Sequence, residues 1–184
     1  MKVLILGGTR FVGHLLAWRL VAGGHRVTMF HRGTRVVPFA DRVETLLGDR
    51  TTGVLPSLIK GREFDATVDF GAYVPGDVEP LVDTVARAAL GHYVLISTGQ
   101  VYLVAADRRP PFREEDAEKP AIPEPPTDTR DHANWVYGMG KRGAEAEVRR
   151  RRGAGLDTLI LRLPVVQGAH DASRRLWAYL QRLL

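Results

Sequence analysis

Residues 3–13 read VLILGGTRFVG, an apolar run that ends in a glycine-rich turn. The run does not alternate apolar with polar residues, so it predicts a strand buried on both faces, as in a parallel sheet. Apolar residues then recur at helical spacing from Phe11 to Ala22, and Gly23-Gly24 predicts the end of that helix. The stretch therefore predicts a strand, a tight turn and a helix in succession.

The turn between this strand and helix has the form of a phosphate-binding turn. Gly7 permits the tight turn, and Gly13 lets the helix pack closely on the strand. The first N–H groups of the helix then point at an anion, which the helix dipole also favours. A purely structural glycine turn is the alternative. The residues expected to hold the pyrophosphate of a dinucleotide are Gly7, Thr9, Arg10, Phe11, Val12 and Gly13.

Strands and helices alternate along the rest of the chain. Further strands are predicted at residues 26–30, 43–47, 66–70, 93–97 and 158–163, and further helices at 55–59, 78–90 and 134–152. This order predicts an α/β fold, a Rossmann-type doubly wound parallel sheet in three αβα layers. Residues 107–131, rich in proline and acids, are interpreted as a mobile flap over the site, with a disordered insert as the alternative.

Composition narrows the class of protein. The chain has 184 residues, enough for one domain with a real core. It has no cysteine, which excludes disulfides, thiolate metal sites and cysteine nucleophiles, and we expect no metal site. No apolar run is long enough to span a bilayer, and Met1-Lys2 leads directly into a strand. We therefore expect no signal peptide, no membrane contact and a cytoplasmic location.

The formal net charge is +5, and arginine supplies most of the basic side chains. One interpretation of this charge is a solvated, arginine-rich surface. The sharper interpretation is a surface that attracts the phosphates of a nucleic acid or of a phosphorylated small molecule.

The end of the second predicted strand bears on the choice of cofactor. An Asp or Glu there would bond the ribose hydroxyls of the adenosine and select NAD. This chain instead has Phe30-His31-Arg32-Gly33. Arg32, with Arg10 opposite, suits the 2′-phosphate of NADP, so we expect NADP in preference to NAD, with His31 and Arg32 as cofactor contacts. The alternative is that Arg32 is only a surface charge.

Two further strand ends supply candidate contacts. Asp49, just after the third strand, is expected to reach the adenine edge. Phe70, Gly71 and Ala72, after the fourth strand, stand where backbone must approach a flat ring. Both expectations rest on the rule that ligands bind at the carboxyl ends of strands in open α/β sheets. Simple turn chemistry is the alternative for both.

Tyr137 and Lys141 lie four residues apart in a predicted helix and so share one face. We expect the charge of Lys141 and the nearby helix N-terminus to lower the pKa of Tyr137 from about 10. Such a tyrosine can move a proton to or from a substrate oxygen. Thr98, after the fifth strand, offers a hydroxyl for a substrate carbonyl, although Ser97 and Thr98 can instead simply cap the strand.

Five motifs follow one another in a characteristic order. They are GGTRFVG (7–13), GDR (48–50), Ser97-Thr98 with Val101-Tyr102, Tyr137 to Lys141 with Glu145, and LRLP (161–164) running to Gly168. Together they resemble the extended short-chain dehydrogenases/reductases of the NAD-dependent epimerase/dehydratase family. The resemblance implies Thr98, Tyr137 and Lys141 as the catalytic residues, with Lys141 also bonding the nicotinamide ribose and Arg50 among the cofactor contacts. Arg10 departs from the family pattern, which has a glycine there.

The resemblance also implies a function. It is NAD(P)-dependent hydride transfer by an oxidoreductase, epimerase or dehydratase acting on a hydroxyl- or keto-bearing small molecule, for which a nucleotide sugar is one candidate. The opening GGTRF also resembles an atypical branch that includes chloroplast stem-loop RNA-binding proteins. A non-catalytic NAD(P) sensor or an RNA-binding protein is therefore the alternative.

The family pattern further implies a domain division and a dimer. Members continue past the sixth strand with a substrate domain, which we expect to be largely absent here. Residues 1–168 are then the NAD(P)-binding domain, and residues 169–184 begin a truncated C-terminal substrate region. We expect the last helix, residues 174–184, to expose an apolar face. The helices at 78–90 and 134–152 resemble those of a dimer interface, so we expect a homodimer.

Overall fold

The computed structural model describes residues 1–85, 87–107, 109–168 and 170–183. Within these residues one sheet holds the strands β1 (Lys2–Leu6), β2 (Arg26–His31), β3 (Glu44–Leu47), β4 (Ala66–Asp69), β5 (His92–Thr98) and β6 (Thr158–Leu163). All neighbouring strands run parallel, in the order β3-β2-β1-β4-β5-β6. The predicted parallel sheet of Rossmann type is confirmed.

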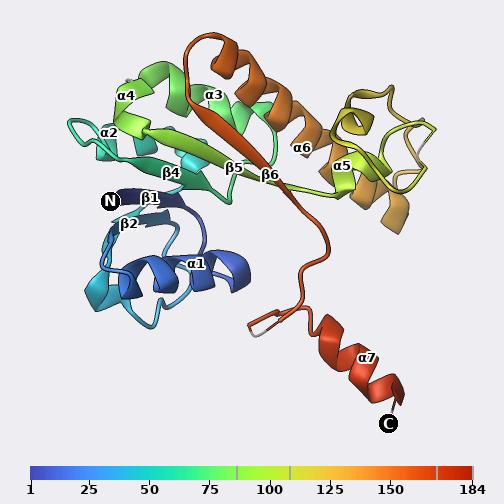
Figure 1. Cartoon of the computed structure of the whole chain (residues 1–184), viewed down its shortest axis with the longest axis horizontal. Helices are drawn as coiled ribbons and strands as arrows, with labels where there is room; N and C mark the ends of the chain where they lie inside the picture. The colour runs from blue at the N-terminus through green and yellow to red at the C-terminus, as the bar shows by residue number, and fades with distance from the viewer. Residues whose placement is uncertain (86, 108, 169, 184) are drawn as a thin grey trace.

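Helices cover the two faces of the sheet (Figure 1). One face carries α1 (Phe11–Ala22), and the other carries α2 (Leu55–Leu58), α3 (Pro75–Thr84), α4 (Arg87–Leu90) and α6 (Arg130–Gly153). The short helix α5 (Gln100–Leu103) packs against α6, and α7 (Arg175–Leu183) follows β6. The layers are those predicted from the alternation of strands and helices.

The central strand β1 needs an uninterrupted apolar run because both of its faces are covered by helices. Successive side chains of a strand point to opposite faces of the sheet. Val3 and Ile5 belong to the core beneath α1, whereas Leu4 and Leu6 belong to the core beneath α3 and α6. All four side chains are buried. The carboxyl end of β1 is thereby fixed between the two helical layers.

The helix predicted over residues 78–90 is wrong in its bounds, because the structure has two helices there. The first, α3, already starts at Pro75, a residue that the first helical turn accommodates. It ends at Thr84, because Val85 is extended, with φ of −98° and ψ of 134°. Ala86 lies outside the described residues.

The helix predicted over residues 134–152 also begins earlier, at Arg130. Thr129 caps it by accepting a hydrogen bond from the backbone N–H of His132 at 3.1 Å. A threonine at this position satisfies an amide that has no partner within the helix. Tyr137 therefore lies about two turns inside α6 and not in its first turn.

The predicted flap, residues 107–131, is hydrogen-bonded through Ile122 to the C-terminal end of α5 and to α6. The Ile122 N–H donates to the Val104 carbonyl at 2.9 Å, beside α5. The indole N–H of Trp135 in α6 donates to the Ile122 carbonyl at 3.1 Å. This segment is therefore tied to the two helices next to the site. Arg108, which the prediction included, lies outside the described residues.

The last predicted helix forms as α7, and its apolar side chains lie in solvent, as expected. Figure 1 shows α7 standing away from the sheet. Between 44% and 83% of each large apolar side chain is exposed, for Leu176, Trp177, Tyr179, Leu180 and Leu183. Ala169 and Leu184, which the predicted C-terminal region included, lie outside the described residues. Within the described part of the chain, no helix is long and apolar enough to cross a membrane.

Candidate active site

The turn after β1 lies in direct contact with the first turn of α1. Gly7 and Gly8 have φ of 78° and 72°, the left-handed region that favours glycine. A Cβ on Gly13 would lie 2.3 Å from the Cα of Gly8, which is too close for two carbon atoms. Within the described residues α1 has neither a side-chain cap nor an acid in its first turn. Its first N–H groups are therefore available to an anion.

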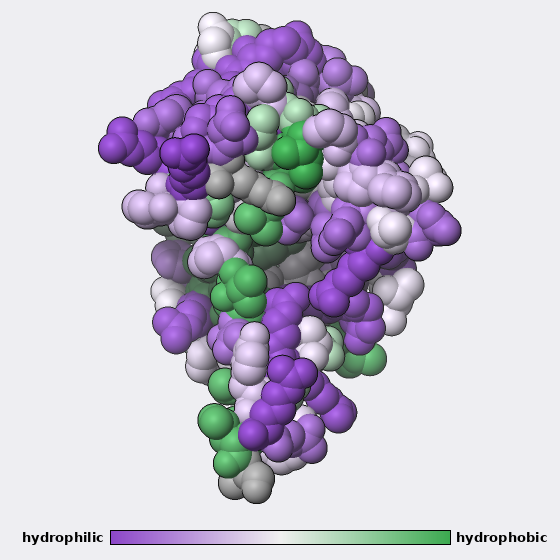
Figure 2. Space-filling model, turned by 90° about the vertical axis from the view of Figure 1, so that its right-hand side faces the viewer, coloured by the Kyte–Doolittle hydropathy of each residue, from purple (hydrophilic) through white to green (hydrophobic). Residues whose placement is uncertain are grey.

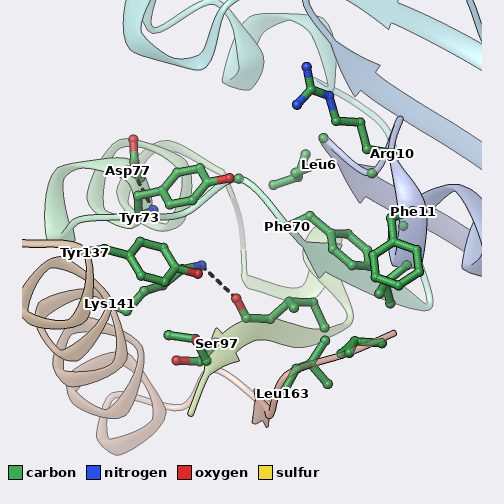
Figure 3. A pocket seen from close by; sticks show the side chains of 18 of the residues that line it. Leu6, Arg10, Phe11, Phe70, Tyr73, Asp77, Ser97, Tyr137, Lys141 and Leu163 are labelled. Carbon is green, nitrogen blue, oxygen red and sulfur yellow. Dashed lines mark hydrogen bonds between the residues drawn. The ribbon is translucent and has the colours of Figure 1, made fainter. Parts of the chain in front are cut away.

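Arg10 occupies the position of the missing middle glycine. Its φ of −127° and ψ of 152° are extended, so this position does not require glycine for its conformation. The side chain is exposed at the rim of the cavity, and Figure 3 shows it extending from the turn while the rings of Phe11 and Phe70 lie deeper. The arginine therefore adds a positive charge beside the turn without distorting it.

A cavity of about 1160 Å³ opens at the carboxyl ends of the strands, and Figure 2 shows the hollow. It is larger than the roughly 300–1,000 Å³ that small-molecule sites usually have. It lies where open α/β sheets bind their ligands. Of the predicted site residues, those that line it are Gly7, Thr9, Arg10, Phe11, Val12, Gly13, His31, Arg32, Asp49, Arg50, Phe70, Gly71, Thr98, Tyr137 and Lys141. Ala72 is the exception, because its side chain is fully buried.

The residues expected to contact the adenosine gather at the ends of β2 and β3. The Arg32 side chain is 70% exposed, with Nη1 3.9 Å from Oδ2 of Asp49. Asp49 accepts from the N–H and the hydroxyl of Thr51 at 3.0 and 2.8 Å, and these bonds lower the pKa of Asp49. Nδ1 of His31 accepts from the Gly33 N–H at 3.1 Å, and burial lowers the pKa of His31. At neutral pH this end of the cavity therefore combines the neutral imidazole of His31, the exposed guanidinium of Arg32 and the carboxylate of Asp49.

Arg50 lines the cavity, and three of its N–H groups donate within the protein. Nη1 and Nη2 each donate to one oxygen of Asp69 at 2.9 Å, and Nη2 also donates to the Asp77 carbonyl at 2.7 Å. Only 14% of the Arg50 side chain is exposed. Its predicted contact with the cofactor stays a prediction.

Three glycines bring α6 close to the site. A Cβ on Gly138 would lie 2.6 Å from Cγ1 of Val104, and a Cβ on Gly140 would lie 2.7 Å from the Tyr73 carbonyl oxygen. A Cβ on Gly143 would lie 2.8 Å from Cγ of Pro75. No other residue type allows the helix to pack this closely against α5 and the start of α3. The same face of α6 carries the tyrosine and the lysine of the predicted catalytic set.

Thr98, Tyr137 and Lys141 all line the cavity. Figure 3 shows Tyr137 and Lys141 next to each other on the same helix. The Thr98 hydroxyl lies near the Tyr137 phenol and acts to lower the pKa of that phenol. The Lys141 ammonium is 2% exposed and donates to the carbonyl oxygens of Ala72 at 2.7 Å and Ile96 at 2.8 Å. The structure thus brings together the three side chains that the motifs singled out.

The expected lowering of the Tyr137 pKa is wrong. Burial raises the pKa of Tyr137, and the Thr98 hydroxyl only partly opposes this. Lys141 points its N–H groups at backbone carbonyls, and burial lowers the pKa of Lys141 to about 8. The helix dipole acts mainly within the first turn, and Tyr137 lies beyond it. At neutral pH the phenol is protonated and the lysine is charged.

Ser97 and Thr98 have different roles in the structure. The Ser97 hydroxyl donates to Oε1 of Glu145 at 2.6 Å, behind the site. Glu145 is 1% exposed and also accepts from the Arg162 guanidinium, at 2.8 Å from Nη2. Arg162 in turn donates to the Tyr102 hydroxyl at 3.0 Å. Ser97 is therefore part of a buried network, whereas Thr98 faces Tyr137.

Replacing Arg162 with leucine is expected to lower the free energy of unfolding by about 3 kcal/mol, because it leaves the buried Glu145 carboxylate short of its main partner. Chemical denaturation followed by circular dichroism measures this loss. The matched control is Arg150→Leu, whose side chain is 62% exposed and whose partner Glu147 keeps its ion pair with Arg151. We expect no measurable change for the control, and equal stability of the two variants would contradict a structural role for the Arg162–Glu145 pair.

Sequence reasoning missed two residues of this region. The Tyr73 ring lies 4.7 Å from Nζ of Lys141 and its centroid is 6.2 Å from that of Tyr137. Asp69 is fully buried at the end of β4. An acid directly before Phe70-Gly71 at a strand end was a usable signal for Asp69. No local pattern marks Tyr73, because its contacts depend on how the loop after β4 folds.

Among the described residues, no group of three or more metal-ligating side chains is placed to hold a metal ion.

Comparison with known proteins gives three kinds of match. Residues 3–184 match the model of the NAD dependent epimerase/dehydratase family. A chloroplast stem-loop binding protein of 41 kDa from Arabidopsis thaliana is 32% identical over 133 residues, which are 65% of this chain and 34% of that protein. The chain thus spans about a third of the length of this relative.

Among solved structures, the Bordetella bronchiseptica enzyme WbmH in complex with NAD⁺ has a TM-score of 0.73 and 22% identity. The match covers 99% of this chain and 62% of that one. The UDP-Glc/GlcNAc 4-epimerase of Campylobacter jejuni has a TM-score of 0.67 and 20% identity, over 88% of this chain and 52% of that one. At these identities the likeness establishes the fold, and in both cases this chain spans less than two thirds of the similar protein.

Proposed function

Because the chain belongs to the NAD-dependent epimerase/dehydratase family, we propose that it binds a nicotinamide dinucleotide in the cavity and transfers hydride with the help of Thr98, Tyr137 and Lys141. One observation carries the proposal: the glycine turn and these three side chains line the same cavity. The chain covers only part of its relatives, so its activity and substrate rest on this site and not on membership of the family.

The residues around the turn fit the phosphates of such a cofactor. The first N–H groups of α1 are uncapped within the described residues. Arg10, Arg32 and Arg35 are exposed at the cavity and add positive charge near them. Backbone N–H groups and guanidinium groups are the usual partners of phosphate oxygens. A bound nicotinamide dinucleotide would supply or accept the hydride.

Tyr137 is the proposed acid–base group. Because burial raises the pKa of Tyr137, the phenol holds its proton at neutral pH and can donate it to a substrate carbonyl oxygen. Thr98 lines the cavity near the phenol and is suited to hold the same substrate oxygen. Lys141 has three N–H donors, two of which bond backbone carbonyls, so the third remains for a ribose hydroxyl.

The proposed substrate is a small molecule with a hydroxyl or keto group, and a nucleotide sugar is the leading candidate. Support comes from the similarity of the fold to a UDP-Glc/GlcNAc 4-epimerase. Epimerisation, dehydration and simple reduction all start from hydride transfer at such a carbon, so the residues of this site serve each of them.

We expect NADPH to bind about tenfold more tightly than NADH, because a 2′-phosphate gains a charge-assisted bond from Arg32 or Arg10. Arg32→Asp is expected to remove this preference. Isothermal titration calorimetry with both cofactors measures it. Arg26→Asp is the matched control, since Arg26 is also exposed but starts β2 at the end away from the cavity. Equal affinities in the parent protein would contradict the preference, although not the binding of a dinucleotide.

A homodimer is part of the proposal. The helices α3 and α6 pack side by side on one face of the molecule. Val74, before α3, and Val136, in α6, are each about half exposed near this face, at 47% and 49%. Apolar side chains of this kind favour association with a second copy.

A second candidate function is binding of a nucleic-acid stem-loop without catalysis. It is favoured by the 32% identity to the chloroplast stem-loop binding protein and by the exposed arginines at the cavity rim. The two candidates differ in their dependence on salt, because neutralised phosphates make affinity for RNA fall steeply as salt rises. Filter binding of a stem-loop RNA at several salt concentrations, with and without NADPH, distinguishes them. The intact pair of Tyr137 and Lys141 favours catalysis, since binding alone does not require it.

A further inference from the structure

A buried ion pair lies directly behind the candidate active site. Asp69 is 0% exposed at the end of β4, and Arg50 meets it with two parallel hydrogen bonds of 2.9 Å. An isolated carboxylate at this depth would be costly, and a bidentate guanidinium is the geometry that best offsets the cost. The pair is therefore specific in its orientation as well as in its charge.

Asp69 also fixes the start of the loop that follows β4. Its Oδ1 accepts from the backbone N–H groups of Gly71 at 2.8 Å and Ala72 at 2.9 Å. Its Oδ2 accepts from the Tyr93 hydroxyl at 2.7 Å. The carboxylate thus holds two successive peptide units of the loop as well as the guanidinium of Arg50.

Arg50 reaches the other end of the same loop. Its Nη2 donates to the Asp77 carbonyl at 2.7 Å, and its Nε lies 3.8 Å from the Asp77 carboxylate. Oδ2 of Asp77 accepts from the N–H groups of Tyr73 at 2.7 Å and Val74 at 3.0 Å. The loop between β4 and α3 is therefore fastened by hydrogen bonds at both ends, to Asp69 at its start and to Asp77 at its end. Arg50 is bonded to both of these residues.

The fastened loop provides the surroundings of Lys141. The Ala72 carbonyl accepts from Nζ at 2.7 Å, and the face of the Tyr73 ring lies 4.7 Å from Nζ. The second carbonyl partner, that of Ile96, comes from β5 at 2.8 Å. The direction of the ammonium group thus depends on where the loop holds Ala72 and Tyr73.

We propose that Arg50 and Asp69 are positioning residues that act on Lys141 by fastening the β4–α3 loop. The proposal concerns the same site as the proposed function and rests on Lys141 having a role there. It explains why an arginine that lines the cavity directs three of its N–H groups at Asp69 and Asp77. It also gives Asp69, which does not line the cavity, an effect on the chemistry of the site.

The proposal can be tested by measuring the pKa of Lys141, which depends on burial and on the charges around it. The pKa of Lys141 is about 8: burial is the largest cause of its lowering and Arg50 adds to it, whereas Asp69, Asp77 and Glu145 each oppose it. Tyr73 and Tyr137 complete the titratable neighbours. If the loop loosens, water reaches the ammonium group, its charged form becomes less costly, and its pKa moves up toward the ordinary value of about 10.4.

The chain has only four lysines, Lys2, Lys60, Lys119 and Lys141, so lysine labelled with ¹³C at Cε gives a simple NMR spectrum. Lys141→Arg identifies its signal. In the parent we expect Lys141 to titrate near pH 8. The titration needs neither cofactor nor substrate. Its failure is therefore distinguishable from failure of the proposed function, which binding and turnover test separately.

Arg50→Lys is the decisive variant, because it keeps the positive charge and loses the two-pronged geometry. We expect it to raise the midpoint of Lys141 by roughly 0.5 to 1 pH unit. Arg50→Met, which also removes the charge, is expected to raise it further. Arg62→Lys is the matched control, since Arg62 pairs with Glu44 at 2.6 Å on the surface, and we expect no shift.

An unchanged Lys141 midpoint in folded Arg50→Lys overturns the proposal, even if Arg50→Met shifts it, because the effect would then be one of charge alone. A dispersed amide spectrum establishes that each variant is folded. If the Arg50 variants do not fold, Tyr93→Phe takes their place. It removes one hydrogen bond to Asp69 without changing any charge, and we expect a smaller upward shift. No shift in Tyr93→Phe would then overturn the proposal.

Discussion

Replacing Gly13 with alanine is expected to weaken binding of NAD(H) or NADP(H) by at least about 100-fold. The added Cβ would lie 2.3 Å from the Cα of Gly8 and 2.9 Å from its carbonyl carbon and oxygen. These are backbone atoms, so no side chain can turn aside to make room. The turn or α1 must move, and the amide groups that would meet the pyrophosphate lose their common direction.

Isothermal titration calorimetry measures this loss, and thermal unfolding shows whether the variant stays folded. Overpacking of this kind costs about 1–3 kcal/mol of stability, which a folded domain can survive. Gly153→Ala is the matched control, because nothing lies within 4 Å of a Cβ at Gly153, the last residue of α6. The control is expected to bind normally. Retained affinity in folded Gly13→Ala would show that the cofactor does not bind at this turn.

Replacing Tyr137 with phenylalanine is expected to lower turnover by about 10³-fold, in the range that loss of a general acid or base produces. The ring and its neighbour Tyr73, at 6.2 Å between centroids, are retained, so only the hydroxyl is lost. Cofactor affinity should therefore change little. The measurement is NAD(P)H formation or consumption across a panel of nucleotide sugars and simpler keto compounds. Tyr179→Phe in the exposed helix α7 is the matched control and is expected to keep full activity.

The pH dependence of the same reaction is a second readout. Lys141, with a pKa of about 8, is charged below that pH and neutral above it. Turnover that uses the ammonium group to orient the ribose should therefore fall as pH rises through about 8. Tyr137 keeps its proton over this range, because its pKa is raised. Unchanged turnover of a substrate by Tyr137→Phe would exclude the proposed acid–base role.

The first strand, the turn after it and the first helix were predictable because their signals are local. The apolar run of β1, the glycines of the turn and the periodicity of α1 follow one another within about twenty residues. The predicted bounds of α1, Phe11–Ala22, agree with the structure. The parallel sheet then follows from alternation alone, since parallel neighbours need a crossover between them.

The bounds of the later helices were predictable only in part. Pro75 and Thr129 are ordinary signals for the start of a helix, at its first turn and its N-cap. Apolar periodicity starts later than these residues, so the predicted helices begin too late. The error matters for Tyr137, because a start at residue 134 would have put the phenol within reach of the helix dipole.

The support of the site was not predictable from spacing. Arg50 follows β3 and Asp69 ends β4, and nothing local in the sequence indicates that their side chains meet. The spacing of Tyr137 and Lys141 predicts a shared helix face but not the direction of the lysine N–H groups. That direction depends on the carbonyl groups of Ala72, in the loop after β4, and of Ile96, in β5.

The three glycines of α6 have a consequence for how the site tolerates change. Gly138, Gly140 and Gly143 each contact a different neighbour, along more than one turn of the helix. These three close contacts therefore fix the rotation of α6 about its axis and its position along that axis. The segment that precedes α6 does not fix them. Insertions or deletions in residues 123–128, before α6, should leave the tyrosine and lysine where they are.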